Sequence, residues 1–290
     1  MTAQALTGEA RRAVPPRLAR WYVDHERAVL GTLVTVLFLV FWEGLSQGWW
    51  ADALRPLVGP AADRLLIRPI FISSPMRIAA EAWRMFFITG EIWSDLRYSA
   101  MEYALGLGLA IAVGMPLGLA AGWYRHLSYA VEPFLSAFNA TPQIALLPLM
   151  IIWVGLGLAT KVLIIFLLAV LPIAISAQAA VRTTDARLLK VAHSFGASEA
   201  HLFRTIILPS AVPYLLAGLR LAVGRAMIGI VVGEIFGSAI GIGAMINRSG
   251  LRFATDKVFV GVLVIAVTGM LLAELVRQIE RRVEAWRPPV

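Results

Sequence analysis

Long apolar runs recur along the chain, separated by short polar segments. Three of them contain no Asp, Glu, Lys or Arg: 103–124, 133–160 and 162–181. Three further runs are shorter or interrupted by charge: 28–50, 212–236 and 258–273. About 20 residues of helix are needed to cross the hydrocarbon core of a membrane. The pattern therefore predicts an all-α polytopic membrane protein with six transmembrane helices.

Composition agrees with a membrane protein. Of the 290 residues, 59% are hydrophobic and only 15% are charged, whereas soluble domains contain about 25% charged residues. Tryptophans gather near the ends of the runs, as in an interfacial aromatic belt: Trp21, Trp49, Trp50, Trp93, Trp123, Trp153 and Trp286. The net charge of +8 is best explained by arginines that face anionic lipid, so the bilayer and not nucleic acid is the expected partner. The absence of cysteine excludes disulfides and thiolate chemistry.

The arginine distribution predicts the orientation. Both ends are rich in arginine, which places them in the cytoplasm and requires an even number of spans. The expected layout is a cytoplasmic tail 1–27, a first transmembrane helix 28–50, an extracytoplasmic segment 51–94 with a short amphipathic helix, a core 95–277 with helices two to six, and a cytoplasmic tail 278–290.

Two rows of glycine recur at a spacing of four residues, which places each row on one helix face. The first row is Gly114, Gly118 and Gly122, and the second is Gly229, Gly233, Gly237 and Gly241. Glycine allows two backbones to approach closely. Each row therefore predicts either packing between helices of one chain or a seam between two copies of the chain.

A charged segment, 182–209, lies between two apolar runs and is expected on the cytoplasmic side. Thr184 is predicted to cap a first short helix, with Asp185 in its first turn, where carboxylates are favoured. Gly196 stands where a left-handed residue usually ends a helix. The segment thus begins with a short, well-delimited helix.

A second short helix is expected directly afterwards. Ser198 can cap it, Glu199 lies in its first turn, and Pro209 marks its end. Both helices carry apolar residues at helical spacing: Leu188, Ala192, Phe195, Leu202, Phe203 and Ile206. The prediction is a rigid two-helix elbow whose apolar face either folds against its own bundle or docks to another protein.

The elbow resembles the EAA loop of binding-protein-dependent ABC importer permeases. That loop reads E-A-A, three residues, G, nine residues, I-x-L-P. In the same register this chain has Lys190, Val191, Ala192, Gly196, Ile206, Leu208 and Pro209. Lys190 and Val191 replace the glutamate and the first alanine, while the spacing, the glycine and the Leu-Pro ending are retained.

Three other stretches resemble the taurine, aliphatic sulfonate and nitrate branch of these permeases. They are ISSP (72–75), TPQIALLPLMIIWVGLGLATK (141–161) and GLRLAVGRAMIGIVVGEI (218–235). The resemblance covers roughly 72–277 and implies a type I ABC importer permease fold in a bacterial inner membrane. It also implies a homodimer, a cytoplasmic ATPase subunit, an extracytoplasmic solute-binding protein, and a small polar or anionic solute such as a sulfonate, taurine, nitrate or a vitamin precursor.

In this family the elbow fits a cleft on the ATPase and transmits its closure to the spans. The resemblance assigns that coupling role to Lys190, Ala192, Gly196, Ala197, Ser198, Glu199, Ile206, Leu208 and Pro209. A phosphate-binding loop needs Gly-Lys-Ser/Thr, and none of the three lysines follows a glycine. The chain is therefore expected to be non-catalytic and without a cofactor, with ATP and Mg²⁺ bound by the separate ATPase.

Polar residues in the spans are candidates for a translocation path or for bonds between helices. They are Asn139, Gln143, Ser176 and Gln178. Glu234, near the outer end, either lines the path or anchors the glycine-rich turn that follows. No metal site is expected, because His193 and His201 fall on separate short helices.

Arg220 and Arg225 lie in the same run as Glu234 but too far from it along the helix for a direct pair. They are expected to reach the cytoplasmic surface or to pair with a neighbouring helix, and a substrate role is the alternative. An ion-coupled secondary transporter that uses Arg220, Arg225 and Glu234 is the competing function. Such a transporter typically has inverted repeats, which the sequence does not show.

Overall fold

The computed structural model describes residues 16–49, 55–57, 59, 69–237 and 239–284. Residues 1–15, most of 50–68 and 285–290 lie outside the described residues, and so do the parts of the predicted tails and extracytoplasmic segment that fall there. The chain divides into two compact units, 1–77 and 78–290.

The first unit contains the helix α1 (Pro16–Gln47) and the short helix α3 (Pro69–Ile72). The apolar part of α1, Ala28–Gln47, is long and apolar enough to cross a membrane. Its end is tied to the following segment, because the Glu43 carboxylate accepts a hydrogen bond from the backbone N–H of Met76 at 3.1 Å.

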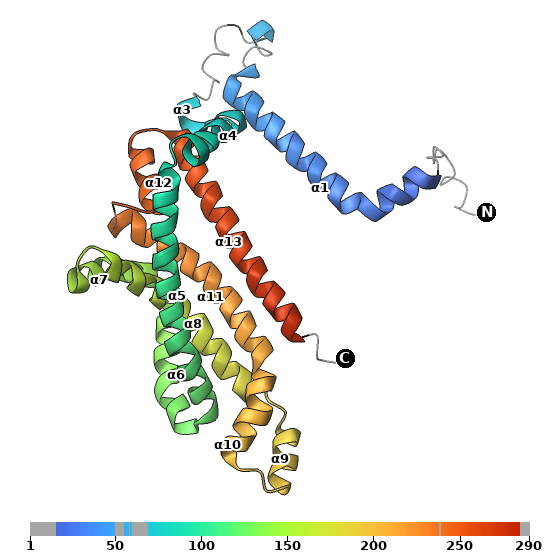
Figure 1. Ribbon diagram of the computed structural model, residues 1–290, viewed down its shortest axis with the longest axis vertical. Coiled ribbons are helices and arrows are strands. Elements are labelled where there is room, and N and C mark those ends of the chain that lie inside the picture. The colour runs from blue at the N-terminus through green and yellow to red at the C-terminus, as the bar shows by residue number, and fades with distance from the viewer. Residues whose placement is uncertain (1–15, 50–54, 58, 60–68, 238, 285–290) are drawn as a thin grey trace. The chain divides into compact units, whose positions relative to one another are not determined.

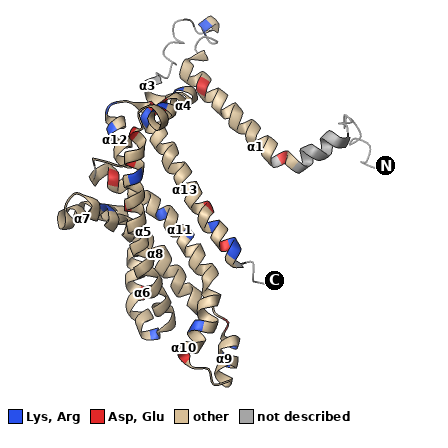
Figure 2. Ribbon diagram, viewed as in Figure 1, with Lys and Arg blue, Asp and Glu red and all other residues tan. Residues whose placement is uncertain are grey.

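The second unit is built around three long helices that lie side by side in Figure 1: α5 (Glu91–Trp123), α8 (Leu158–Arg182) and α11 (Leu208–Gly237). The helix α13 (Thr255–Glu284) packs along α11. A short helix, α4 (Pro75–Trp83), followed by a π turn at 84–88, precedes α5. Figure 2 shows long stretches of α5, α8, α11 and α13 without charge, as a membrane requires.

Among the described residues, five helices are long and apolar enough to cross a membrane, and six if one bent pair counts as a single span. The bent pair corrects the predicted continuous run 133–160. It consists of α6 (Arg125–Ala140), a 3₁₀ turn at 143–146 and α7 (Leu147–Val154), with a bend of 92°. Thr141 is extended because it precedes Pro142, whose ring excludes a helical conformation at the preceding residue.

The end of the elbow also differs from the expectation. Pro209 does not end a helix, because α10 (Glu199–Leu202), a π turn at 203–207 and α11 form one continuous helix over Glu199–Gly237. A proline ring would normally clash with the carbonyl four residues earlier. The π turn just before Pro209 widens the helix there and accommodates the ring.

The glycine rows lie at contacts within the chain. On the first row, a Cβ added to Gly114 would lie 2.9 Å from the Val170 carbonyl oxygen of α8, and one on Gly122 would lie 2.6 Å from Val181 Cβ. On the second row, Gly233 packs against α8, where an added Cβ would lie 3.0 Å from Ile164 Cγ2. Gly241 lies beyond the end of α11 and so is not on the same helix face. These contacts make the packing of α8 between α5 and α11 depend on missing side chains.

We expect Gly118→Ala to destabilise the helix bundle, because its Cβ would lie 2.7 Å from Ala177 Cβ on α8. Overpacking of this kind costs about 1–3 kcal/mol. The matched control is Gly108→Ala in the same helix, where nothing lies within 4 Å of the added atom. Thermal unfolding in detergent should show a lower Tm for Gly118→Ala alone. Equal Tm values for the two variants would contradict the close packing of α5 and α8.

Candidate functional site

The elbow begins with a helix capped by an aspartate. The helix α9 (Ala186–Ser194) has Asp185 as its N-cap, and the Asp185 carboxylate accepts a hydrogen bond from the backbone N–H of Arg187 at 2.8 Å. The predicted cap, Thr184, instead donates its hydroxyl hydrogen bond back to the Ala180 carbonyl of α8. Thr184 and Asp185 are both good capping residues, so their order could not be decided from the sequence.

Gly196 ends α9 as predicted. Its φ of 76° is left-handed, and the chain closes a Schellman motif there. The backbone N–H of Ala197 donates to the Ala192 carbonyl at 3.1 Å, and the N–H of Gly196 donates to the His193 carbonyl at 2.9 Å. Both bonds go to carbonyls in the last turn of α9, and they fix the turn between the two elbow helices.

The second elbow helix starts at the predicted cap, because Ser198 Oγ accepts a hydrogen bond from the N–H of His201 at 3.4 Å. This helix is anchored to the bundle. Leu202 and Ile207 are fully buried, and the ring of Phe203 meets the ring of Trp123 at the end of α5, with centroids 5.8 Å apart. The second half of the elbow is therefore held against its own chain.

The apolar face of α9 has no such cover. No residue of α9 is buried, and Leu188, Val191 and Phe195 are exposed, with Phe195 at 87%. A groove of about 700 Å³ runs along this face. Its lining comprises Leu188, Val191, Ala192, Phe195, Gly196, Ala197, Ser198, His201, Thr205 and Ile206. An exposed apolar groove on a rigid support has the properties of a docking surface.

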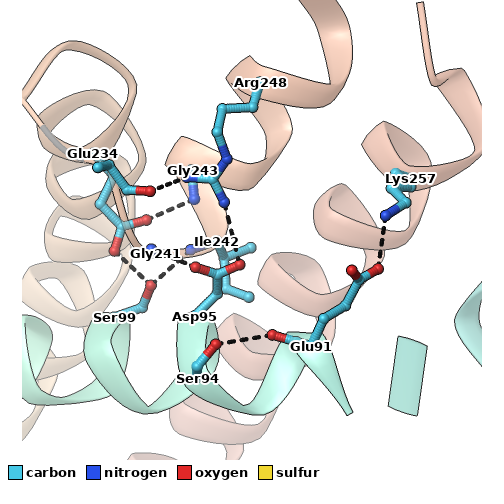
Figure 3. Close-up of polar contacts among 11 residues, drawn as sticks. Glu91, Ser94, Asp95, Ser99, Glu234, Gly241, Ile242, Gly243, Arg248 and Lys257 are labelled. Atoms are coloured by element: carbon cyan, nitrogen blue, oxygen red, sulfur yellow. Dashed lines mark hydrogen bonds and ion pairs between the residues drawn. The ribbon is translucent and has the colours of Figure 1, made fainter. Parts of the chain in front are cut away.

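A polar network lies at the other end of the bundle, where α11 turns into the short helix α12 (Ile242–Leu251) (Figure 3). The first backbone N–H groups of α12 have no partner within the helix. The N–H of Gly241 donates to the Asp95 carboxylate at 2.8 Å, and that of Ile242 donates to Ser99 Oγ at 3.0 Å. Both acceptors come from α5, so the start of α12 is fixed to that helix.

Glu234 completes the network from α11. Its carboxylate accepts hydrogen bonds from the N–H of Gly243 at 2.6 Å and from the Ser99 hydroxyl at 2.5 Å. Gly241 has a φ of 123°, and an added Cβ would lie 2.7 Å from a Glu234 carboxylate oxygen. The structure thus uses Glu234 to anchor the glycine-rich turn, which was one of its two expected roles. Its part in a translocation path stays a prediction.

A buried ion pair joins α5 to α8 in the same region. Lys161 of α8 pairs with Glu102 of α5, and the two residues are 1% and 0% exposed. The Lys161 ammonium also lies 4.5 Å from the centre of the Tyr98 ring. The second carboxylate oxygen of Glu102 has no hydrogen-bond partner in the described part of the chain. This pair was not predicted from the sequence, although each residue directly precedes a charge-free run.

The remaining path candidates are spread along the bundle. Gln143 donates to the Phe138 carbonyl at 2.8 Å across the break after α6, and Gln178 donates to Ser128 Oγ at 3.4 Å, linking α8 to α6. Ser176 lies at the contact of α8 with Gly218 of α11, whereas Asn139 is exposed. Gln143 and Gln178 thus form bonds within the chain, and the structure does not bring the four residues together.

The two arginines of α11 differ in their surroundings. Arg220 forms an ion pair with Glu280 of α13, so the expected pairing with a neighbouring helix is confirmed for this residue. Arg225 is exposed and has no ion-pair or hydrogen-bond partner among the residues that the structure describes. Arg220, Arg225 and Glu234 therefore do not form one site within the chain.

The described part of the chain thus combines helices of membrane length with an elbow whose first helix has no buried residue. Residues 114–285 match the model of the family described as binding-protein-dependent transport system inner membrane component, and the chain belongs to this family. It is a multi-pass inner-membrane permease of the ABC importer class.

Relatives of the chain match it over most of its length. The taurine transport system permease protein TauC of Escherichia coli (strain K12) is 31% identical over 93% of this chain and 94% of its own length. The putative aliphatic sulfonates transport permease protein SsuC of Bacillus subtilis (strain 168) is 32% identical over 83% and 88%. The riboflavin transport system permease protein RibX of Chloroflexus aurantiacus (strain ATCC 29366 / DSM 635 / J-10-fl) is 32% identical over 94% and 96%.

Among solved structures, a chain of the inward-facing MetNI methionine ABC transporter has the same fold, with a TM-score of 0.58 and 18% identity. The alignment covers 69% of this chain and 97% of that one. The type I importer permease fold implied by the motif resemblance is thereby confirmed.

We expect the Lys161–Glu102 pair to be visible in a double-mutant cycle. Lys161→Met alone leaves a buried carboxylate without its counter-charge, which costs about 3–5 kcal/mol. Glu102→Gln alone should also destabilise the fold. The double variant removes both charges and should lose clearly less stability than the sum of the two single variants. Additive Tm losses in detergent would mean that the two charges do not interact.

Proposed function

We propose that this chain is the membrane permease of an ATP-driven importer, and that closure of a separate ATPase is transmitted to its spans through the elbow. The observation that carries the proposal is the uncovered groove of α9, with Phe195 exposed, beside a helix that continues without a break into a transmembrane span. A large aromatic side chain on a rigid turn is suited to fill a pocket on a partner.

The elbow residues divide into two roles in this proposal. Gly196, Ala197 and Ser198 shape the turn, and Ala192 and Ile206 line the groove with the exposed aromatic side chain. Leu208 and Pro209 begin α11 directly after the groove, while Glu199 lies in the first turn of α10. Lys190 is exposed on α9 and presents a positive charge to the ATPase. The family motif has a negatively charged glutamate at this position. The ATPase surface facing it is then expected to be acidic at that point.

The elbow end of the bundle is proposed to face the cytoplasm, with both termini on the same side. The α12 end then faces outward and receives solute from an extracytoplasmic binding protein. Two copies of the chain would form the transporter, with the path at their interface and alternating access driven by ATP. Membership of the importer family supports both partners, and the homodimer is the simplest assembly for one permease chain.

The solute is proposed to be a small polar or anionic molecule. Relatives that match most of the chain are named for transport of taurine, aliphatic sulfonates and riboflavin, which are all polar solutes but differ in their chemical skeletons. The polar end of the bundle, near Asp95 and Arg248, has a pocket of about 450 Å³ that is large enough for a molecule of this size.

An ion-coupled secondary transporter is the less favoured function. It would need Arg220, Arg225 and Glu234 to act as one coupled set, but the first pairs with α13 and the third anchors the α12 turn. The elbow would also have no role in such a transporter. Uptake driven by an ion gradient without any ATPase would favour this function over the proposed one.

We expect Phe195→Glu to abolish co-purification of the ATPase from native membranes in mild detergent, because it adds a charge at the centre of the apolar groove. Ser194→Glu, which adds the same charge on a neighbouring exposed position outside the groove, is the matched control and should retain the ATPase. Both variants should keep the wild-type Tm, since neither side chain is buried. Retention of the ATPase by Phe195→Glu would refute docking through this face.

A further inference from the structure

An arginine lies near the middle of the apolar run of α11, which is long enough to cross a membrane. Arg225 is 13 residues from the start and 11 from the end of the apolar run 212–236, or about 20 Å and 17 Å along the axis. A side chain can reach the interface from the ends of a helix but not from this depth. The charge of Arg225 must therefore be solvated within the protein assembly.

The described part of the chain does not provide that solvation. Arg225 is exposed, and no ion pair or hydrogen bond reaches it within the described part of the chain. Arg220, five residues earlier, has Glu280 as its partner. Lys161 has Glu102, so the protein elsewhere pairs the charges that it places inside the membrane.

Arg225 belongs to a continuous uncovered stripe along α11, which we define as the open face of α11: Ala217, Leu221, Gly224, Arg225 and Ile228. These residues lie three or four positions apart and so share one side of the helix. Leu221 is 62% and Ile228 is 48% exposed, and nothing lies within 4 Å of a Cβ added to Gly224. Lipid is a poor cover for this face, because hydrocarbon offers an arginine no hydrogen-bond acceptor.

We propose that the open face of α11 lines the water-filled translocation path and that Arg225 is the residue that selects anionic solutes in it. The proposal rests on the permease function proposed above. The guanidinium carries a fixed positive charge and five donors in a planar fork, which match a sulfonate, phosphate or carboxylate group. Gly224 beside it leaves space for the solute to reach the charge. Within the described residues, the path would thus have a cation without a resident counter-ion.

The natural absence of cysteine makes this face directly testable in the intact complex. Leu221→Cys places a single thiol one helical turn from Arg225. The probes are two membrane-impermeant methanethiosulfonate reagents of similar size, one carrying a sulfonate and the other a trimethylammonium group. The matched control is Val267→Cys on α13, which is exposed at 47% and whose neighbours three and four positions away are all apolar.

We expect the Leu221→Cys thiol to react with both reagents in native membranes, and faster with the sulfonate. Adding Arg225→Gln should reduce the ratio of the two rates roughly tenfold, because a unit charge a few ångströms away changes the local ion concentration to that extent in a partly hydrated site. Arg225→Lys, which keeps the charge, should restore most of the ratio. The Val267→Cys thiol should react with neither reagent.

A thiol at position 221 that does not react with either reagent, or a rate ratio that is unchanged by Arg225→Gln, would overturn the proposal. Co-purification of the ATPase is measured on the same membranes. If the ATPase is retained while the thiol is unreactive, only the role of the α11 face is refuted. If the ATPase is absent while the ratio depends on Arg225, the anion path remains and the ATP-driven function is refuted.

Discussion

A lysine placed between apolar helices has to keep a carboxylate beside it, and in this protein Lys161 depends on Glu102 in this way. In a membrane the cost of separating the two charges is high, since neither lipid nor a neighbouring apolar side chain can take the place of the partner. The pair therefore fixes the register of α8 against α5. Glycines along α5 and α11 then allow both helices to approach α8 closely.

At both ends of the bundle the backbone groups of a helix turn are hydrogen-bonded, but only the elbow end leaves an apolar helix face uncovered. At the α12 end, carboxylates and a hydroxyl satisfy the first N–H groups of a short helix, so polar groups are paired and the turn is closed. At the elbow end, the turn itself is satisfied by a Schellman motif and a serine cap, but the apolar face beside it is uncovered. The backbone groups of the α12 turn are satisfied within the chain, whereas the apolar face of α9 is left for the proposed ATPase to cover.

Sequence patterns predicted the features that depend on local chemistry. The membrane helices follow from charge-free runs, Gly196 from the need for a left-handed residue, and Ser198 from its capping hydroxyl. The sharp bend at Thr141 was missed, because an apolar run looks the same whether it is one helix or two. The Lys161–Glu102 pair was also missed, since nothing local indicates which residues, 59 positions apart, will meet.

α10, the π turn and α11 form one helix that links the elbow to the opposite end of the bundle. From Glu199 to Gly237 there are 38 steps without a break, so the rod is about 57 Å long. In the proposed importer, a displacement of the elbow would be transmitted along this continuous helix to the opposite end of the bundle. Because the far end of this helix is bonded to α12 through Glu234, nucleotide binding to the proposed ATPase would change the tilt of α12 at the opposite end of the bundle.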